Sequence, residues 1–138
     1  MSQLLDPHAA LIATMVLVAA ADEGTISDAE IETMTRLVAN LPAFAAFDRA
    51  RIGEIGRGCA ELLAREDGLE IALARIAQAL PAPLRETAYA LACDVAAADQ
   101  EASQDELRLL ALLRERFELD PLVAAAIERA ARARHRRV

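Results

Sequence analysis

Two acidic turns, at residues 20–30 and 97–106, constrain the fold of this chain more than any other feature. Each turn follows an apolar helical run and ends in a serine that stands three residues before a glutamate: Ser27 with Glu30, and Ser103 with Glu106. This spacing predicts a capping box, in which the serine side chain accepts from the glutamate N–H and the glutamate side chain accepts from the serine N–H. Each turn therefore predicts the end of one helix and the start of the next.

The apolar spacing on both sides of the turns matches as well. Before the turns, Ile12, Met15, Val16 and Ala19 correspond to Tyr89, Ala92, Cys93 and Ala96; after them, Ile31, Met34, Leu37 and Leu41 correspond to Leu107, Leu110, Leu113 and Phe117. We interpret this as an internally duplicated helical hairpin. Repeat 1 covers about residues 8–41 and repeat 2 about residues 85–117.

Composition and length indicate one all-α domain over residues 1–138. Hydrophobic residues make up 55% of the chain, which is enough for one core, but aromatic residues make up only 3%. Small and straight-chain residues favour close helix packing over a β-sandwich, which prefers β-branched and aromatic side chains. We therefore expect a single bundle of about seven helices, built around the two pseudo-repeated hairpins.

Several local signals mark helix starts. Asp6-Pro7 and Asp120-Pro121 each combine an N-cap residue with a proline at the first helical position. The first helix is expected to run to about Asp22, and Asp48 is expected to cap the third helix. Asp67 and Glu70 have the spacing of a further capping box.

Between the two repeats lie residues whose packing can also be predicted. Phe44 and Phe47, in a short connector, are expected to fill the core. Gly53, Gly56 and Gly58 weaken the third helix, each by about 1 kcal/mol relative to Ala. We expect these glycines to let a neighbouring backbone approach closely.

The charge distribution argues against nucleic acid as a partner. The net charge is −7, and residues 1–128 hold all 22 acidic residues but only 10 of the 15 arginines, with no lysine anywhere. Such an acidic body repels phosphates and permits a cation or a basic partner. The five arginines from Arg129 to Arg137 are most simply a solvated helix end, although they could also touch an anionic surface.

The cysteines and the apolar N-terminal run predict a cytoplasmic protein. Cys59 and Cys93 have no metal-ligand spacing and are expected to act as small hydrophobes. The run at residues 9–21 is too short to span a bilayer, has no basic leader, and has an internal counterpart at residues 89–98. We expect no integral membrane segment; a homodimer is compatible with so alanine-rich a surface.

The pattern of the two turns resembles the TerB-like family, which is named for bacterial tellurite resistance. In that family an Ala-rich helix ends in Ala-Asp-Gly, and a Ser/Asp-x-x-Glu start opens the next helix, twice per domain. This chain departs from the pattern with Glu23 before Gly24, and with Gln100 where the family usually has Gly. The resemblance implies a role in resistance to tellurite and related stresses, and it supplies no reaction.

The acidic turns also yield a candidate metal site. If the hairpins bring the turns together, the oxygen ligands are Asp22, Glu30, Asp94, Asp99 and Glu106. An all-oxygen set suits Ca²⁺, Mg²⁺ or Mn²⁺ better than Zn²⁺. Two alternatives stay open: the acids can serve only as helix caps, and Asp94 can pair with an arginine such as Arg57 or Arg85.

Recognised enzyme motifs are missing from the sequence. His8 and His135 lie near the termini without triad or metal spacing, and Gly53-x-x-Gly56 lies within an apolar helical pattern. We therefore expect no catalytic residue and no cofactor other than a divalent cation. The functional hypotheses are a stress-response module that binds a cation and docks a protein partner, a metal-independent adaptor, and, less favoured, a metal-assisted hydrolase.

Overall fold

The computed structural model describes residues 5–21, 26–98 and 102–138. Over these ranges the chain forms seven α-helices and no strand, as the sequence predicted: α1 (Pro7–Ala19), α2 (Asp28–Asn40), α3 (Ile52–Leu63), α4 (Gly68–Ala79), α5 (Ala82–Ala97), α6 (Gln104–Arg116) and α7 (Pro121–Arg134). Two short 3₁₀ helices, Pro42–Phe44 and Arg49–Arg51, join α2 to α3.

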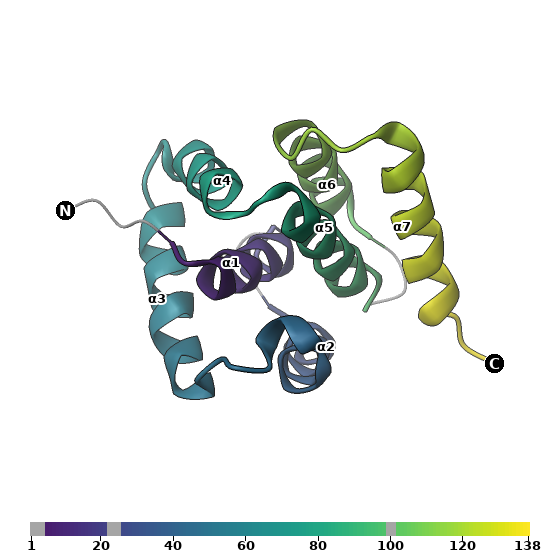
Figure 1. Cartoon of the computed structure of the whole chain (residues 1–138), viewed down its shortest axis with the longest axis horizontal. Coiled ribbons are helices and arrows are strands. Elements are labelled where there is room, and N and C mark those ends of the chain that lie inside the picture. Colours follow the sequence, from purple (N-terminus) through teal and green to yellow (C-terminus); the bar gives the residue numbers. More distant parts are fainter. Residues whose placement is uncertain (1–4, 22–25, 99–101) are drawn as a thin grey trace.

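Two helices, α1 and α5, form the centre of the bundle. They make the most extensive contact of any helix pair, with α3 and α7 at opposite edges (Figure 1). Ten of the 13 residues of α1 are buried, because the helix is apolar on almost every face. The buried hydroxyl of α1, on Thr14, donates to the carbonyl oxygen of Ala10 over 2.8 Å, so it costs little inside the core.

Three of the predicted aspartate caps are confirmed. Asp6 accepts from the Ala9 N–H over 2.8 Å, and Asp120 accepts from the Leu122 N–H over 2.8 Å. Asp48 caps the 3₁₀ turn that leads into α3, accepting from the Ala50 N–H over 3.0 Å. Helix α1 ends at Ala19, three residues before the predicted Asp22.

Phenylalanines Phe44 and Phe47 are buried as predicted. Their ring centroids lie 6.0 Å apart, and the His8 ring lies 5.2 Å from that of Phe47. His8 Nε2 is also 3.0 Å from the carbonyl oxygen of Ala43. This aromatic cluster fastens the connector after α2 to the start of α1.

The predicted capping box at the start of α4 is wrong. Asp67 makes no side-chain cap bond there, and its carboxylate lies 3.6 Å from Arg65. Glu70 pairs with Arg116 of α6 instead, because that guanidinium lies within its reach. A tertiary ion pair has replaced the local cap.

The prediction for the α3 glycines is also wrong. A Cβ added at Gly56 or Gly58 would meet nothing within 4 Å, so no backbone approaches them. The close approach occurs at Gly68, where a Cβ would lie 1.8 Å from the carbonyl oxygen of Leu62. Only glycine lets the chain turn back so tightly from α3 into α4.

The helices share one core, but their packing does not show the two predicted repeated hairpins. Helix α2 packs mainly against α5, and α6 contacts α5, α1 and α4. The elements of the two sequence repeats are thus interleaved across α1 and α5. The internal duplication remains a prediction from sequence.

Candidate functional site

Both predicted capping boxes are present with the same geometry. Ser27 Oγ accepts from the Glu30 N–H over 3.1 Å, and Glu30 Oε1 accepts from the Ser27 N–H over 2.8 Å. In the second box the corresponding distances, between Ser103 and Glu106, are 3.1 and 2.9 Å. These bonds satisfy N–H groups that every helix start leaves without an intrahelical acceptor.

The two glutamates are almost fully buried, with 4% of Glu30 and 3% of Glu106 exposed. Each carboxylate lies over the first turn of its helix, where the helix dipole favours negative charge. Each glutamate therefore has a capping role at the start of its helix. Asp22 and Asp99, the two aspartates of the predicted metal site, lie outside the described residues.

Asp94, the remaining predicted ligand, forms an ion pair. Its Oδ1 accepts from Arg134 over 2.6 Å and lies 3.3 Å from His135 Nε2. The predicted class of partner, an arginine, is confirmed, but the arginine comes from the end of α7. Arg85 is engaged elsewhere: it donates to the carbonyl oxygens of Ala77 and Leu80 at the end of α4.

The predicted metal cluster is therefore not assembled by the three of its members that can be located. Over residues 5–21, 26–98 and 102–138, no three His, Cys, Asp or Glu side chains are grouped as metal ligands would be. Glu30 and Glu106 cap the starts of α2 and α6, and Asp94 pairs with Arg134 at the end of α7. The part that the two turn aspartates play stays a prediction.

A second polar cluster lies between α5, α6 and α7. Tyr89 donates to Glu128 over 2.5 Å, while Arg114 donates to both, over 2.9 and 3.0 Å. Burial and the adjacent Glu128 carboxylate raise the pKa of Tyr89, so the phenol stays a donor at physiological pH. This cluster and the Asp94–Arg134 pair hold α7 on α5.

Hollows occur on both sides of α3. None of its 12 residues is buried, although Ile52, Ile55, Cys59 and Leu62 pack against the core. A helix with an apolar face but no buried residue is incompletely covered by its neighbours. The space beside it divides into a groove toward α6 and a cleft toward α4.

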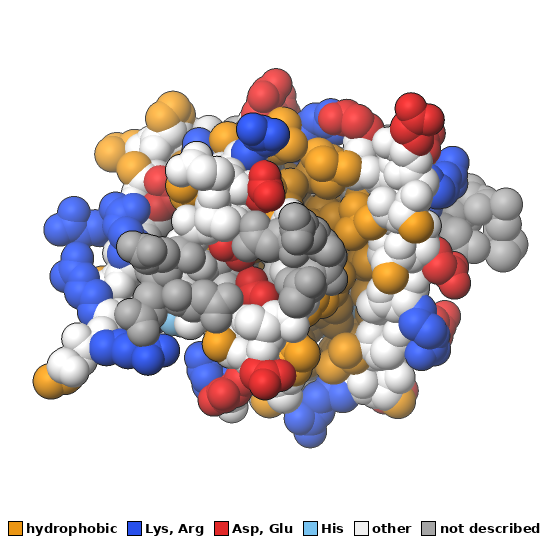
Figure 2. All heavy atoms as spheres, turned by 180° about the vertical axis from the view of Figure 1, so that it is seen from behind, with side chains coloured by type: hydrophobic (Ala, Val, Ile, Leu, Met, Phe, Trp, Pro, Cys, Tyr) orange, Lys and Arg blue, Asp and Glu red, His pale blue; other side chains and the backbone are white. Residues whose placement is uncertain are grey.

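The groove between α3 and α6, hereafter the α3–α6 groove, has a volume of about 830 Å³. Figure 2 shows it as a hollow with a hydrophobic floor beside α3. Its apolar lining consists of Val16, Leu17, Ala20, Ala21, Ile26, Gly56, Ala60, Leu63, Ala64, Leu69, Leu109 and Leu112. Asp105 and Arg108 are the two charged residues at its edge.

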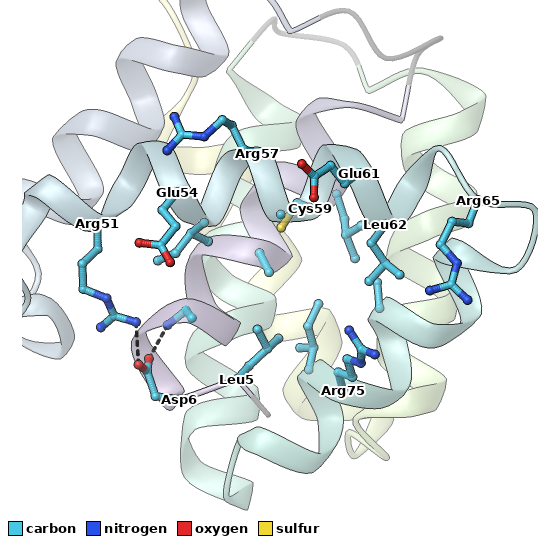
Figure 3. Close-up of a pocket in the computed structure, with 17 residues that line it drawn as sticks. Leu5, Asp6, Arg51, Glu54, Arg57, Cys59, Glu61, Leu62, Arg65 and Arg75 are labelled. Carbon is cyan, nitrogen blue, oxygen red and sulfur yellow. Dashed lines mark hydrogen bonds and ion pairs between the residues drawn. The ribbon is translucent and has the colours of Figure 1, made fainter. Parts of the chain in front are cut away.

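The cleft on the other side, hereafter the α3–α4 cleft, has a volume of about 640 Å³ and also touches the start of α1 (Figure 3). At one end Arg51 pairs with Asp6 over 2.6 Å. Although burial opposes the effect, hydrogen bonds from Ala9 and Arg51 hold the pKa of Asp6 below its usual value. The Cys59 thiol also lines the cleft, and burial raises its pKa.

Sequence reasoning missed both hollows, yet one signal for the groove was present. Gly56, Ala60 and Ala64 recur every four residues, which places three small residues on one face of α3. On α6, Asp105, Arg108, Leu109 and Leu112 follow the i, i+3, i+4, i+7 pattern of a single face. A face of small residues opposite a leucine-bearing face indicates a groove only when the helix arrangement is known.

None of the helices within the described ranges is long and apolar enough to cross a membrane. Among known proteins, neither the curated sequences nor the solved structures gave a match to this chain. The family model described as tellurite resistance protein TerB matches residues 8–130, which is most of the chain and includes both capping boxes. The all-α fold, the two boxes and this match agree, and the chain belongs to the TerB family.

Proposed function

We propose that this TerB-family chain is a non-enzymatic, cytoplasmic docking module in a stress response of the tellurite-resistance type. The α3–α6 groove holds an amphipathic helix of a protein partner. The observation that carries the proposal is the groove itself, a hollow of about 830 Å³ with a mainly apolar lining, open to solvent between two helices. Soluble proteins seldom leave such a surface exposed without a binding role.

The shape of the walls favours a helix as the occupant. Gly56, Ala60 and Ala64 give the α3 wall a stretch of small residues beside Leu63, and a Cβ at Gly56 would meet open space. A helix backbone can approach such a wall closely, while Leu109 and Leu112 on the α6 wall contact its apolar face. Asp105 and Arg108 supply one charge of each sign at the edge, which suits a partner with mixed charges.

The groove proposal is tested with a phage-displayed library of helical peptides whose exposed face is randomised. Peptides selected on the wild-type chain should carry apolar residues at i, i+3, i+4 and i+7. Their binding should shift amide NMR signals of α3 and α6. Gly56→Ala should weaken them by roughly tenfold, because a methyl group fills a packed interface.

Gly58→Ala is the matched control. It adds the same methyl to the same helix, but on the side of the α3–α4 cleft. Equal affinity of both variants for the selected peptides, or peptide signals confined to another surface, would reject the groove as the docking site. A dimer that Gly56→Ala converts to monomers would instead assign the groove to a second copy of this chain.

The link to stress is tested separately by complementation. A host strain that lacks the gene is challenged with tellurite while it carries the wild type, Gly56→Ala or Gly58→Ala. Tolerance should return with the wild type and Gly58→Ala and be reduced with Gly56→Ala. If the wild-type gene restores no tolerance, the stress assignment fails, even where peptide docking holds.

Divalent-cation binding is the second candidate, and the two buried glutamates favour it. Glu30 and Glu106 bring carboxylates to the described edges of the acidic turns, next to the segments that contain Asp22 and Asp99. This oxygen donor set fits Ca²⁺, Mg²⁺ or Mn²⁺, whereas Asp94 fits poorly because its Oδ1 is paired with Arg134. A bound cation would neutralise the turns and tie them together.

The cation proposal is tested by thermal unfolding of EDTA-treated protein, with each divalent cation added in turn. A cation at 100 times its Kd adds about 2.7 kcal/mol to the free energy of unfolding, if only the folded state binds it. The resulting increase in Tm should disappear in Asp99→Asn. No increase with any cation would leave the glutamates as helix caps alone.

A further inference from the structure

The α3–α4 cleft combines an apolar floor with a concentration of arginines. Ala9 and Ala13 of α1, Ile55 and Leu62 of α3, and Ile76 of α4 form the floor. Four arginines line the cleft, Arg51, Arg57, Arg65 and Arg75, in a chain whose net charge is −7. Three acidic residues, Asp6, Glu54 and Glu61, share the lining.

The charges are not evenly distributed along the cleft. Arg51 pairs with Asp6 at one end, and Glu54 lies on the same side (Figure 3). Arg57 and Glu61 line the outer rim of the cleft on α3, and the Arg57 side chain extends along the helix away from Leu62 (Figure 3). Arg65 and Arg75 lie beside Leu62 at the other end, which makes that end cationic.

Arg75 is the arginine at this end with no acidic partner. Arg65 has Asp67 at 3.6 Å, whereas Arg75 has no ion pair with any residue that the structure describes. Arg75 is half-buried, and no carboxylate among the described residues pairs with its guanidinium. A bound anion would supply a counter-charge and form charge-assisted hydrogen bonds.

We propose that the α3–α4 cleft binds a small amphipathic carboxylate. The carboxylate is held by Arg75, with Arg65 beside it, and the hydrocarbon chain lies on the apolar floor. A guanidinium matches the planar geometry of a carboxylate, and the floor removes the chain from water. The volume of about 640 Å³ lies within the usual range for small-molecule sites.

The probe is decanoate below its micelle concentration, compared with decanol and decyltrimethylammonium. Decanoate should shift the amide signals of α1, α3 and α4 around the cleft, and the shifts should saturate. It should bind with higher affinity than decanol or decyltrimethylammonium. It should also protect Cys59, which lines the cleft, from a thiol reagent. Arg75→Gln should weaken decanoate binding by roughly tenfold, since a charge-assisted bond is lost.

Arg108→Gln is the matched control, because Arg108 lines the α3–α6 groove and not the cleft; it should change the affinity by less than about twofold. Arg75→Lys keeps the charge but not the planar fork, and should bind with intermediate affinity. Thermal unfolding of each variant establishes that the fold is kept.

The proposal is overturned if decanol binds as tightly as decanoate, if Cys59 is not protected, or if Arg75→Gln leaves the affinity unchanged. It is overturned equally if the shifted signals map to the α3–α6 groove. Gly56→Ala separates this site from the docking groove, since that variant should bind decanoate normally while it loses the helical peptides.

Discussion

The central helices α1 and α5 differ from the peripheral helix α3 in coverage rather than in the presence of apolar side chains. Ten of the 13 residues of α1 and eight of the 16 of α5 are buried, but none of the 12 residues of α3 is. All three helices carry apolar residues at helical spacing. What distinguishes them is that α1 and α5 are surrounded, while α3 has a hollow on each side.

This difference separates stability from binding within one small bundle. The central pair supplies more than half of the buried hydrophobic residues, so it makes a large contribution to the hydrophobic stabilisation. Helix α3 adds less, and its glycines lower its helix propensity further. Because α3 contributes less to stability, its residues can form binding surfaces with less effect on the fold.

The largest expected difference is in the reactivity of the two thiols. Burial raises the pKa of Cys93 on α5 to about 12, against 9.0 for an exposed cysteine, and the neighbouring Tyr89 hydroxyl offsets this only in part. Since the thiolate is the reactive form, Cys93 should label on the order of 1000-fold more slowly than an exposed thiol at pH 8. Cys59 on α3 is only half-buried and should label much faster.

The same pKa gives the pH dependence of stability. A raised folded-state pKa stabilises the fold fully below the unfolded pKa of 9.0, and this contribution is lost as pH rises from there toward about 12.

The difference in thiol reactivity is measured by following the labelling rates with mass spectrometry, with Cys59→Ser and Cys93→Ser to assign the sites. Equal rates for the two thiols would mean that α5 opens as readily as α3.

The next largest effect is expected from truncating one apolar side chain in each region. Met15 of α1 is fully buried, so Met15→Ala should lower the free energy of unfolding by about 2–5 kcal/mol. Leu62 of α3 is only half-buried, so Leu62→Ala should cost about 1 kcal/mol. Urea unfolding measures both; similar losses would show that α3 is part of the stabilising core.

Substitution of two glycines by alanine should change the stability in opposite directions. A methyl at Gly68 would collide with the Leu62 carbonyl, so Gly68→Ala should destabilise by about 2 kcal/mol or more. At Gly56 the methyl meets open space, so Gly56→Ala should stabilise by up to about 1 kcal/mol through helix propensity. Thermal unfolding decides the sign, and a destabilised Gly56→Ala would mean that the groove wall is already filled.

The fold could be predicted from the sequence because its signals are local. Ser27 and Glu30, or Asp120 and Pro121, specify a helix start within a few residues, and the structure confirms them. The Asp67–Glu70 box failed because a distant arginine, Arg116, competes for Glu70. Sequence spacing carries no information on such a competitor.

The candidate sites depend on tertiary neighbours and were less predictable. Asp94 was identified as a buried acid that needs a partner, but its partners, Arg134 and His135, lie 40 and 41 residues along the chain. The arginines of the α3–α4 cleft come from a 3₁₀ helix, α3, the turn after it and α4, and no spacing in the sequence links Arg51, Arg65 and Arg75. Their common cleft exists only in the folded chain.

The smallest expected effects concern the ion pairs of the two regions. Asp94 of α5 is 7% exposed, and Asp94→Ala should cost about 1–2 kcal/mol, because the hydrogen bonds that fasten the end of α7 are lost. Arg51 and Asp6, beside α3, are both well exposed, so Arg51→Ala should cost less than about 1 kcal/mol and the loss should shrink in high salt. Urea unfolding at low and high ionic strength compares the two variants. If the Arg51 variant loses as much free energy of unfolding as the Asp94 variant, the edge beside α3 contributes as much to stability as the centre. Stability and binding would then not be divided between the two regions.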